Sequence, residues 1–142
     1  MTLTEIQDQI IEEFSAFEDW MDRYNYLIEL GHELPATDPK FKTDDYLING
    51  CQSKVWLHAE FIDGRMSFTA DSDAIIVKGI VALLIRALNN QKAEEIMNAD
   101  LYFIDKIGLK ENLSPTRSNG LVSMVKKMKM YSLAYHAKHS GH

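Results

Sequence analysis

The chain has 142 residues, of which 46% are hydrophobic and 25% are charged, and it contains only 7 Gly and 3 Pro. These values exclude collagen-like, low-complexity and wholly disordered proteins, and they predict one globular domain, residues 1–142, with a core that needs no disulfides. The net charge is −6, and the acidic excess lies mainly in the first third of the chain. Nucleic acid is therefore not expected as a partner.

Cys51 is the single cysteine of the chain. One thiol forms neither an internal disulfide nor a Cys-based metal site, so we expect no bound metal and a reducing, cytoplasmic setting. The first 14 residues lack the basic start and cleavage site of a secretory leader. The most apolar stretch, Ala74 to Leu88, is interrupted by Lys78 and Arg86 and is too short for a membrane span. No membrane partner is expected.

Helical patterns dominate the first third of the chain. Thr2 and Glu5 fit a capping box, and apolar residues spaced three to four apart follow as far as Phe17, which predicts an amphipathic helix. A second helix is expected from about Trp20 to Leu30, with Gly31 as its C-cap. An irregular connection then leads to about residue 45.

The middle of the chain alternates as strands do, and it contains two turn signals, Asn49-Gly50 and Asp63-Gly64. The pattern predicts an antiparallel meander of three short strands: Tyr46–Ile48, Val55–Phe61 and Arg65–Thr69.

Four further elements are expected after the meander. A strongly apolar helix begins near Ala74, with Ser72 or Asp73 as its cap, and must be buried against the sheet. A short acidic helix is expected at Lys92–Met97, and a brief apolar element at Leu101–Leu109. The last helix is expected to begin at Ser114-Pro115. The predicted fold class is α+β, a single domain with a three-stranded antiparallel sheet packed against several helices.

Three blocks of sequence resemble the SufE family of sulfur-acceptor proteins, and they occur in the family's order. The first surrounds the cysteine, the second spans the end of the meander and the start of the apolar helix, and the third opens the last helix. They read Asn49-Gly50-Cys51-Gln52-Ser53-Lys54-Val55-Trp56, Ala70-Asp71-Ser72-Asp73-Ala74 with Ile76-Val77-Lys78-Gly79, and Leu113-Ser114-Pro115-Thr116-Arg117 with Asn119-Gly120-Leu121.

The resemblance implies a cytoplasmic partner of a pyridoxal-phosphate-dependent cysteine desulfurase of the SufS type or a relative of it. On this resemblance, the desulfurase persulfide is expected to pass its outer sulfur to Cys51, and the sulfur is then expected to go to a SufBCD-type assembly complex for iron–sulfur clusters. The resemblance also implies an IscU-like α+β fold. Pyridoxal phosphate belongs to the partner, so no cofactor is expected on this chain, and a chain with one cysteine suits a carrier better than a cluster scaffold.

The chemistry of the residues agrees with a carrier that reacts when docked. An unperturbed thiol with a pKa near 8.5 is only about 3% thiolate at pH 7, and lowering that pKa gains little because nucleophilicity falls with it. Positioning by a partner gains far more. Candidate residues for the cysteine loop and for partner docking are Asn49, Gly50, Gln52, Ser53, Asp71, Asp73 and Arg117.

Each candidate also has a structural alternative. Cys51 can be an inert core thiol, Asp71 and Asp73 can serve a helix cap, and Arg117 can pair with either of these acids. His58 is a conceivable catalytic base. The spacing of His136, His139 and His142 suits a metal, although fraying of the chain end is the expectation adopted.

Two further function classes stay open beside the sulfur carrier. One is a stand-alone cysteine-dependent enzyme, either a hydrolase or a peroxide-reducing thiol protein. The other is a binding module in which Cys51 is inert.

Overall fold

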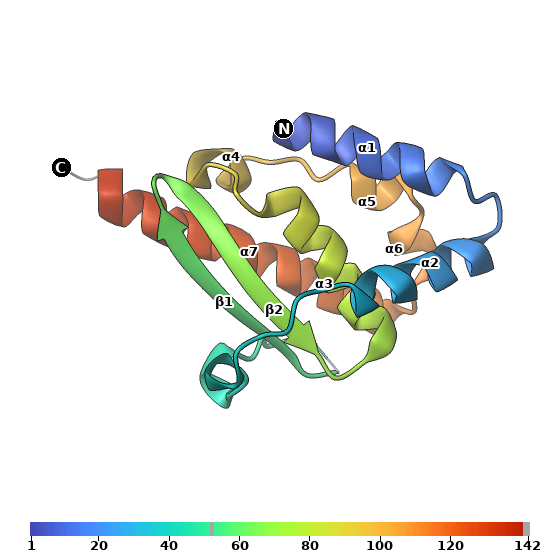
Figure 1. Ribbon diagram of the computed structural model, residues 1–142, viewed down its shortest axis with the longest axis horizontal. Helices are drawn as coiled ribbons and strands as arrows, with labels where there is room; N and C mark the ends of the chain where they lie inside the picture. Colours follow the sequence, from blue (N-terminus) through green and yellow to red (C-terminus); the bar gives the residue numbers. More distant parts are fainter. Residues whose placement is uncertain (52, 141–142) are drawn as a thin grey trace.

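The computed structural model describes residues 1–51 and 53–140. Its helices and strands form an α+β arrangement in which helices pack on an antiparallel hairpin, as predicted (Figure 1). In chain order the elements are α1 (Leu3–Ser15), α2 (Trp20–His32), the 3-10 turns η1 (Pro39–Phe41) and η2 (Asp44–Tyr46), β1 (Val55–Ile62), β2 (Arg65–Ser72), α3 (Ile75–Leu88), α4 (Ala93–Met97), α5 (Phe103–Lys106), α6 (Leu109–Asn112) and α7 (Pro115–Ser140). Across the described residues, no helix has the length and apolar character needed to cross a membrane.

The sheet has two strands within the described ranges, so the prediction of three strands is wrong. β1 and β2 pair in antiparallel register along their whole length. The expected strand Tyr46–Ile48 makes only an isolated bridge, between Leu47 and Trp56. Because Tyr46 belongs to η2 and Gly50 turns the chain with a φ of +92°, too few extended residues remain between them to build a ladder.

The apolar helix α3 lies between the hairpin and α2, in the centre of the molecule (Figure 1). Most of its side chains are buried, as its apolar sequence predicts. The predicted cap is wrong, because Ala74 is the N-cap residue and its side chain accepts no hydrogen bond from the first turn of α3. Ser72 Oγ instead accepts a hydrogen bond from the Ala74 N–H at 3.2 Å, one residue before the helix begins.

α2 and α3 cross at two glycines. α2 continues through Gly31 to His32, so Gly31 is not the predicted C-cap. A Cβ on Gly31 would lie 2.8 Å from the Gly79 nitrogen, and a Cβ on Gly79 would collide with the Leu27 carbonyl oxygen. The role of Gly31 is therefore close helix packing, which depends on a residue far away in the sequence.

α1 begins with the predicted capping box and is tied to the core by a charged pair. The Thr2 hydroxyl accepts from the Glu5 N–H, and the Glu5 carboxylate accepts from the Thr2 N–H, both at 3.1 Å. Arg86 of α3 hydrogen-bonds the Glu13 carboxylate and thereby lowers the pKa of Glu13. Burial and the hydrogen bond that Tyr26 donates to Glu13 raise the pKa of Tyr26 to about 12.

The chain after α4 is more broken than predicted and ends in a long helix. The expected element Leu101–Leu109 is divided into α5 and α6 around Gly108, which has a φ of +82°. α7 begins as predicted, with the Ser114 hydroxyl accepting from the Arg117 N–H at 3.3 Å. It runs behind the hairpin toward the hairpin tip (Figure 1), where the ring of His139 stacks on Phe61 at 4.7 Å. The expected fraying is therefore wrong as far as Ser140.

Replacing Gly79 with Ala tests the helix crossing. The added methyl group meets backbone rather than a flexible side chain, so α2 and α3 must separate, and we expect a loss of about 2 kcal/mol in the free energy of unfolding, typical of overpacking. Urea denaturation measures it. Ile75→Ala is the matched control on the same helix, because Ile75 is exposed, and it should stay within about 0.5 kcal/mol of the parent. Equal stability of Gly79→Ala and the control would contradict the crossing.

Candidate functional site: the Cys51 turn

Cys51 lies on the turn that leads into β1, and both ends of this turn are fixed by hydrogen bonds. At the start, the Ile48 N–H donates to the Val55 carbonyl at 2.9 Å. At the end, the Lys54 N–H donates to the Asp73 carboxylate at 3.0 Å, and the Asp73 N–H donates to the Lys54 carbonyl at 3.2 Å. The carboxylate of Asp73 therefore clamps the end of the cysteine turn to the segment between β2 and α3, and does not cap the helix.

The turn rests directly on α7. A Cβ on Gly50 would lie 2.5 Å from the Ser123 hydroxyl, and the φ of +92° at Gly50 also disfavours any larger residue. Cys51 Sγ lies 3.6 Å from the Gly120 carbonyl oxygen, to which the thiol donates a weak hydrogen bond. A Cβ on Gly120 would stand 3.5 Å from the same sulfur. Two glycines thus allow the turn and the helix to approach.

The sulfur borders a small cavity of about 100 Å³ between the turn, α3 and α7. Val77 and Ile80 of α3 and Met124 of α7 form its apolar side. The polar side is formed by Ser53, Thr116 and Arg117. This volume exceeds the roughly 30 Å³ that a water molecule occupies in the liquid, so an additional atom bonded to Cys51 has room beside the apolar side chains.

The thiol is half-buried, and this burial raises the pKa of Cys51 above its ordinary value. A raised pKa means that the sulfur holds its proton more firmly, so the fraction of thiolate at pH 7 is smaller than for a free cysteine. The resting site therefore protects its sulfur and does not activate it.

Asp71 is placed in a separate ionic network beside the turn. Its carboxylate binds Lys42 at 2.9 Å and Lys78 at 3.4 Å. Burial alone would raise the pKa of Asp71, but the hydrogen bonds from Lys42 and the Ser72 N–H and the charge of Lys78 together lower it. Lys42 and Lys78 pair with Asp71, and the Asp73 carboxylate binds the Lys54 N–H. The suggested ion pair of Arg117 with either acid is therefore wrong. Arg117 is instead exposed at the rim of the cavity.

No histidine lines the cavity among the residues that the structure describes. His58 is engaged elsewhere, because its ring stacks on Phe41 at 3.7 Å and its Nε2 lies 3.2 Å from the Glu60 carboxylate. No group of three His, Cys, Asp or Glu side chains that could hold a metal occurs in residues 1–51 and 53–140, and His142 lies outside those ranges.

The sequence-based candidates are only partly brought together. Cys51, Ser53 and Arg117 share the cavity, Gly50 and the exposed Asn49 form the turn, and Gln52 lies outside the described residues.

The side of the cavity that α3 and α7 supply is not among the residues predicted from the sequence. Gly120 could have been found, because a glycine inside a helix costs roughly 0.5–1 kcal/mol and so signals a close contact. Val77 and Ile80 carry no such signal, because their burial looks like that of any core residue.

The pH dependence of alkylation measures the burial of the thiol. Because burial raises the pKa of Cys51, its reaction with iodoacetamide should be slower at pH 7 than that of an exposed cysteine, and its rate should rise at a higher pH. The matched control is Asn49→Cys in a Cys51→Ser background, which moves the thiol to an exposed position on the same turn. Coinciding pH profiles for the two thiols would contradict the account.

Comparison with protein families supports the resemblance seen in the sequence. Residues 8–132 match the family model described as "SufE: Fe-S metabolism associated domain". Two bacterial relatives match over most of their length. The chain is 46% identical over 127 residues to an uncharacterized SufE-like protein of Rhizobium etli, with 86% of each chain covered. It is 42% identical over 127 residues to an uncharacterized SufE-like protein of Rhizobium meliloti, with 86% of this chain and 91% of that protein covered.

A plant protein and a solved structure extend the comparison. The chain is 34% identical over 131 residues to SufE-like protein 1, chloroplastic/mitochondrial, of Arabidopsis thaliana, which covers 92% of this chain but only 35% of that protein. The fold is similar to the solution structure of a hypothetical protein from Thermus thermophilus, with a TM-score of 0.75 and 21% identity over 91% of this chain and 94% of that one. The chain therefore belongs to the SufE family of Fe–S metabolism associated proteins, a membership that implies interaction with a cysteine desulfurase.

Proposed function

We propose that this protein is a sulfur acceptor and carrier that receives persulfide sulfur on Cys51 from a cysteine desulfurase, stimulates that enzyme, and passes the sulfur on to iron–sulfur cluster assembly. The observation that carries the proposal is the position of Cys51, half-buried on a fixed turn beside a cavity with room for one more atom. The family match and the SufE-like relatives support the same role.

The proposed transfer needs only one thiol of this chain. The Cys51 thiolate attacks the outer sulfur of the desulfurase persulfide, a sulfur–sulfur bond forms as another breaks, and the desulfurase thiolate leaves and takes up a proton. No electrons are gained or lost overall. An acceptor thiolate later repeats the exchange at the Cys51 persulfide. Pyridoxal phosphate is needed only on the desulfurase, which we propose to be of the SufS type, with a SufBCD-type complex as the later recipient.

The cavity suits the resting persulfide. The outer sulfur would fit against the buried side chains of Val77, Ile80 and Met124. A persulfide is more acidic than a thiol, and Arg117 supplies positive charge at the rim for its anionic form. We propose that docking to the desulfurase lifts the turn from this position, because the buried thiol is a poor nucleophile as it stands.

The carrier is better supported than a stand-alone thiol enzyme. A hydrolase requires a base within hydrogen-bond reach of the sulfur, and a peroxide-reducing protein gains from a lowered thiol pKa. The part of the cavity lining that the structure describes contains no His, Asp or Glu, and the pKa of Cys51 is raised. Both features favour a thiol that depends on a partner.

Intact mass spectrometry tests the proposal. The protein is mixed with a SufS-type desulfurase, pyridoxal phosphate and cysteine, separated from the enzyme, and measured before and after reduction. We expect an adduct of about 32 Da per sulfur atom that reductant removes. Cys51→Ser should show no adduct and should no longer stimulate the desulfurase. An unmodified parent protein, with folded structure and a titratable thiol, would refute the carrier role.

A displaced thiol provides the second arm of this experiment. The Cys51→Ser, Asn49→Cys variant keeps one cysteine on the turn but moves it away from the cavity. If placement matters, its persulfide should form slowly and should be lost to glutathione at least about tenfold faster than that of the parent.

A further inference from the structure

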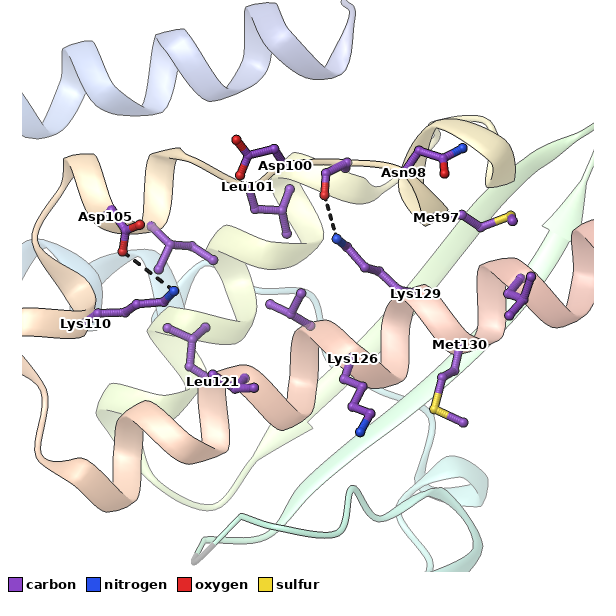
Figure 2. A pocket seen from close by; sticks show the side chains of 15 residues that line it. Met97, Asn98, Asp100, Leu101, Asp105, Lys110, Leu121, Lys126, Lys129 and Met130 are labelled. Atoms are coloured by element: carbon purple, nitrogen blue, oxygen red, sulfur yellow. Dashed lines mark hydrogen bonds and ion pairs between the residues drawn. The ribbon is translucent and has the colours of Figure 1, made fainter.

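An apolar groove runs along α7, away from the Cys51 turn. It has a volume of about 600 Å³, within the range of small-molecule ligand sites, and it lies between α7 and the chain from α4 to α6. Leu101 and Leu121 line its floor (Figure 2). Three large apolar side chains of α7 stay more than half exposed at this wall: Val122 at 53%, Met130 at 52% and Leu133 at 52%.

The α7 wall has the length and spacing of a helix-packing seam. The groove follows α7 from Leu121 to Leu133, a rise of roughly 18 Å at 1.5 Å per residue. Val122, Lys126, Lys129 and Leu133 are spaced four, three and four apart, so they share one face of α7, with apolar residues at its two ends and lysines between them. An amphipathic helix lying along α7 is the natural complement of such a surface.

The α7 wall of the groove is positively charged, whereas the acids of the lining, Asp100 and Asp105, lie on the facing wall. Both charged residues of the α7 wall are lysines, and Figure 2 shows Lys126 projecting from the helix. Lys129 donates to the Ala99 carbonyl at 2.5 Å, and Lys110 on the facing wall pairs with Asp105 at 3.8 Å. Lys126 has no ion pair among the described residues, so a carboxylate on an incoming helix would find an available partner there.

The groove and the thiol cavity occupy opposite sides of α7. Gly120 and Met124 face the Cys51 turn. Val122 stands two residues from each of them, which is about 200° around a helix of 3.6 residues per turn. A helix bound in the groove would therefore leave Cys51 open to a second protein.

We infer that this groove docks an amphipathic helix that carries carboxylates, on a protein that binds while the desulfurase is at the thiol. This inference rests on the proposed function, and it assigns the helix to the protein that takes the sulfur onward. Such a protein would be held close to Cys51 throughout loading, which raises its effective concentration at the persulfide.

The probes for the test are two fluorescein-labelled 18-residue helical peptides. Both carry leucines at the spacing of the α7 seam, and their remaining positions are mainly Glu in one and mainly Lys in the other. Fluorescence anisotropy measures binding to the parent and to Val122→Asp, Leu133→Asp and Lys126→Glu. The matched controls are Met21→Asp and Lys138→Glu, which change exposed residues away from the groove. Circular dichroism and thermal unfolding verify that each variant is folded.

The parent should bind the Glu peptide more tightly than the Lys peptide. Val122→Asp and Leu133→Asp should weaken binding at least about tenfold, Lys126→Glu should reverse the peptide preference, and the controls should match the parent. Sulfur loading by the desulfurase should be the same for all folded variants. A parent that binds the peptide but accepts no sulfur supports the groove and counts against the proposed function.

Three results would overturn the inference. The first is that the Glu peptide does not bind, or binds equally to the parent and the groove variants. The second is that the groove variants lose sulfur loading while the controls keep it, because the occupant would then be the desulfurase. The third is sedimentation of the parent as a dimer that Leu133→Asp abolishes, because the occupant would then be a second copy.

Discussion

The close packing of the Cys51 turn on α7 is the contact on which the site depends. It exists because Gly50 turns with a positive φ beside Ser123 and because Gly120 presents no side chain to the sulfur. The same contact half-buries Cys51, raises its pKa and creates the small cavity beside it. Protection of the sulfur and low reactivity in the resting protein thus have one physical cause. The proposed carrier therefore needs a partner to become reactive.

Local patterns predicted the fold where local interactions decide it. The capping box of α1, the hairpin and the buried apolar helix all follow from the spacing of neighbouring residues. The errors have non-local causes. Gly31 looks like a helix end, but it continues the helix because Gly79 packs against it. Leu47 looks like part of a strand, but η2 and the turn at Gly50 leave it only a single bridge to Trp56.

The same limit applies to the site. The position of Cys51 on a turn was predictable from its neighbours, and the family resemblance drew attention to Asp73 and Arg117. Their contacts were not predictable, because each depends on a choice among several charged residues. Lys42, which precedes the turn, and Lys78 of α3 bind Asp71, and the backbone N–H of Lys54 binds Asp73. Arg117 is consequently left at the cavity rim.

The central claim is that docking to the desulfurase releases the Cys51 turn from its packed position. Hydrogen exchange of the Lys54 and Asp73 amides tests it most directly, because these two hydrogen bonds clamp the end of the turn. The exchange should be measured with and without a desulfurase whose own transfer cysteine has been replaced, so that no sulfur moves. The account predicts faster exchange at both amides in the complex, while the β1–β2 ladder keeps its protection. Unchanged or slower exchange at both amides, with binding demonstrated, would contradict it.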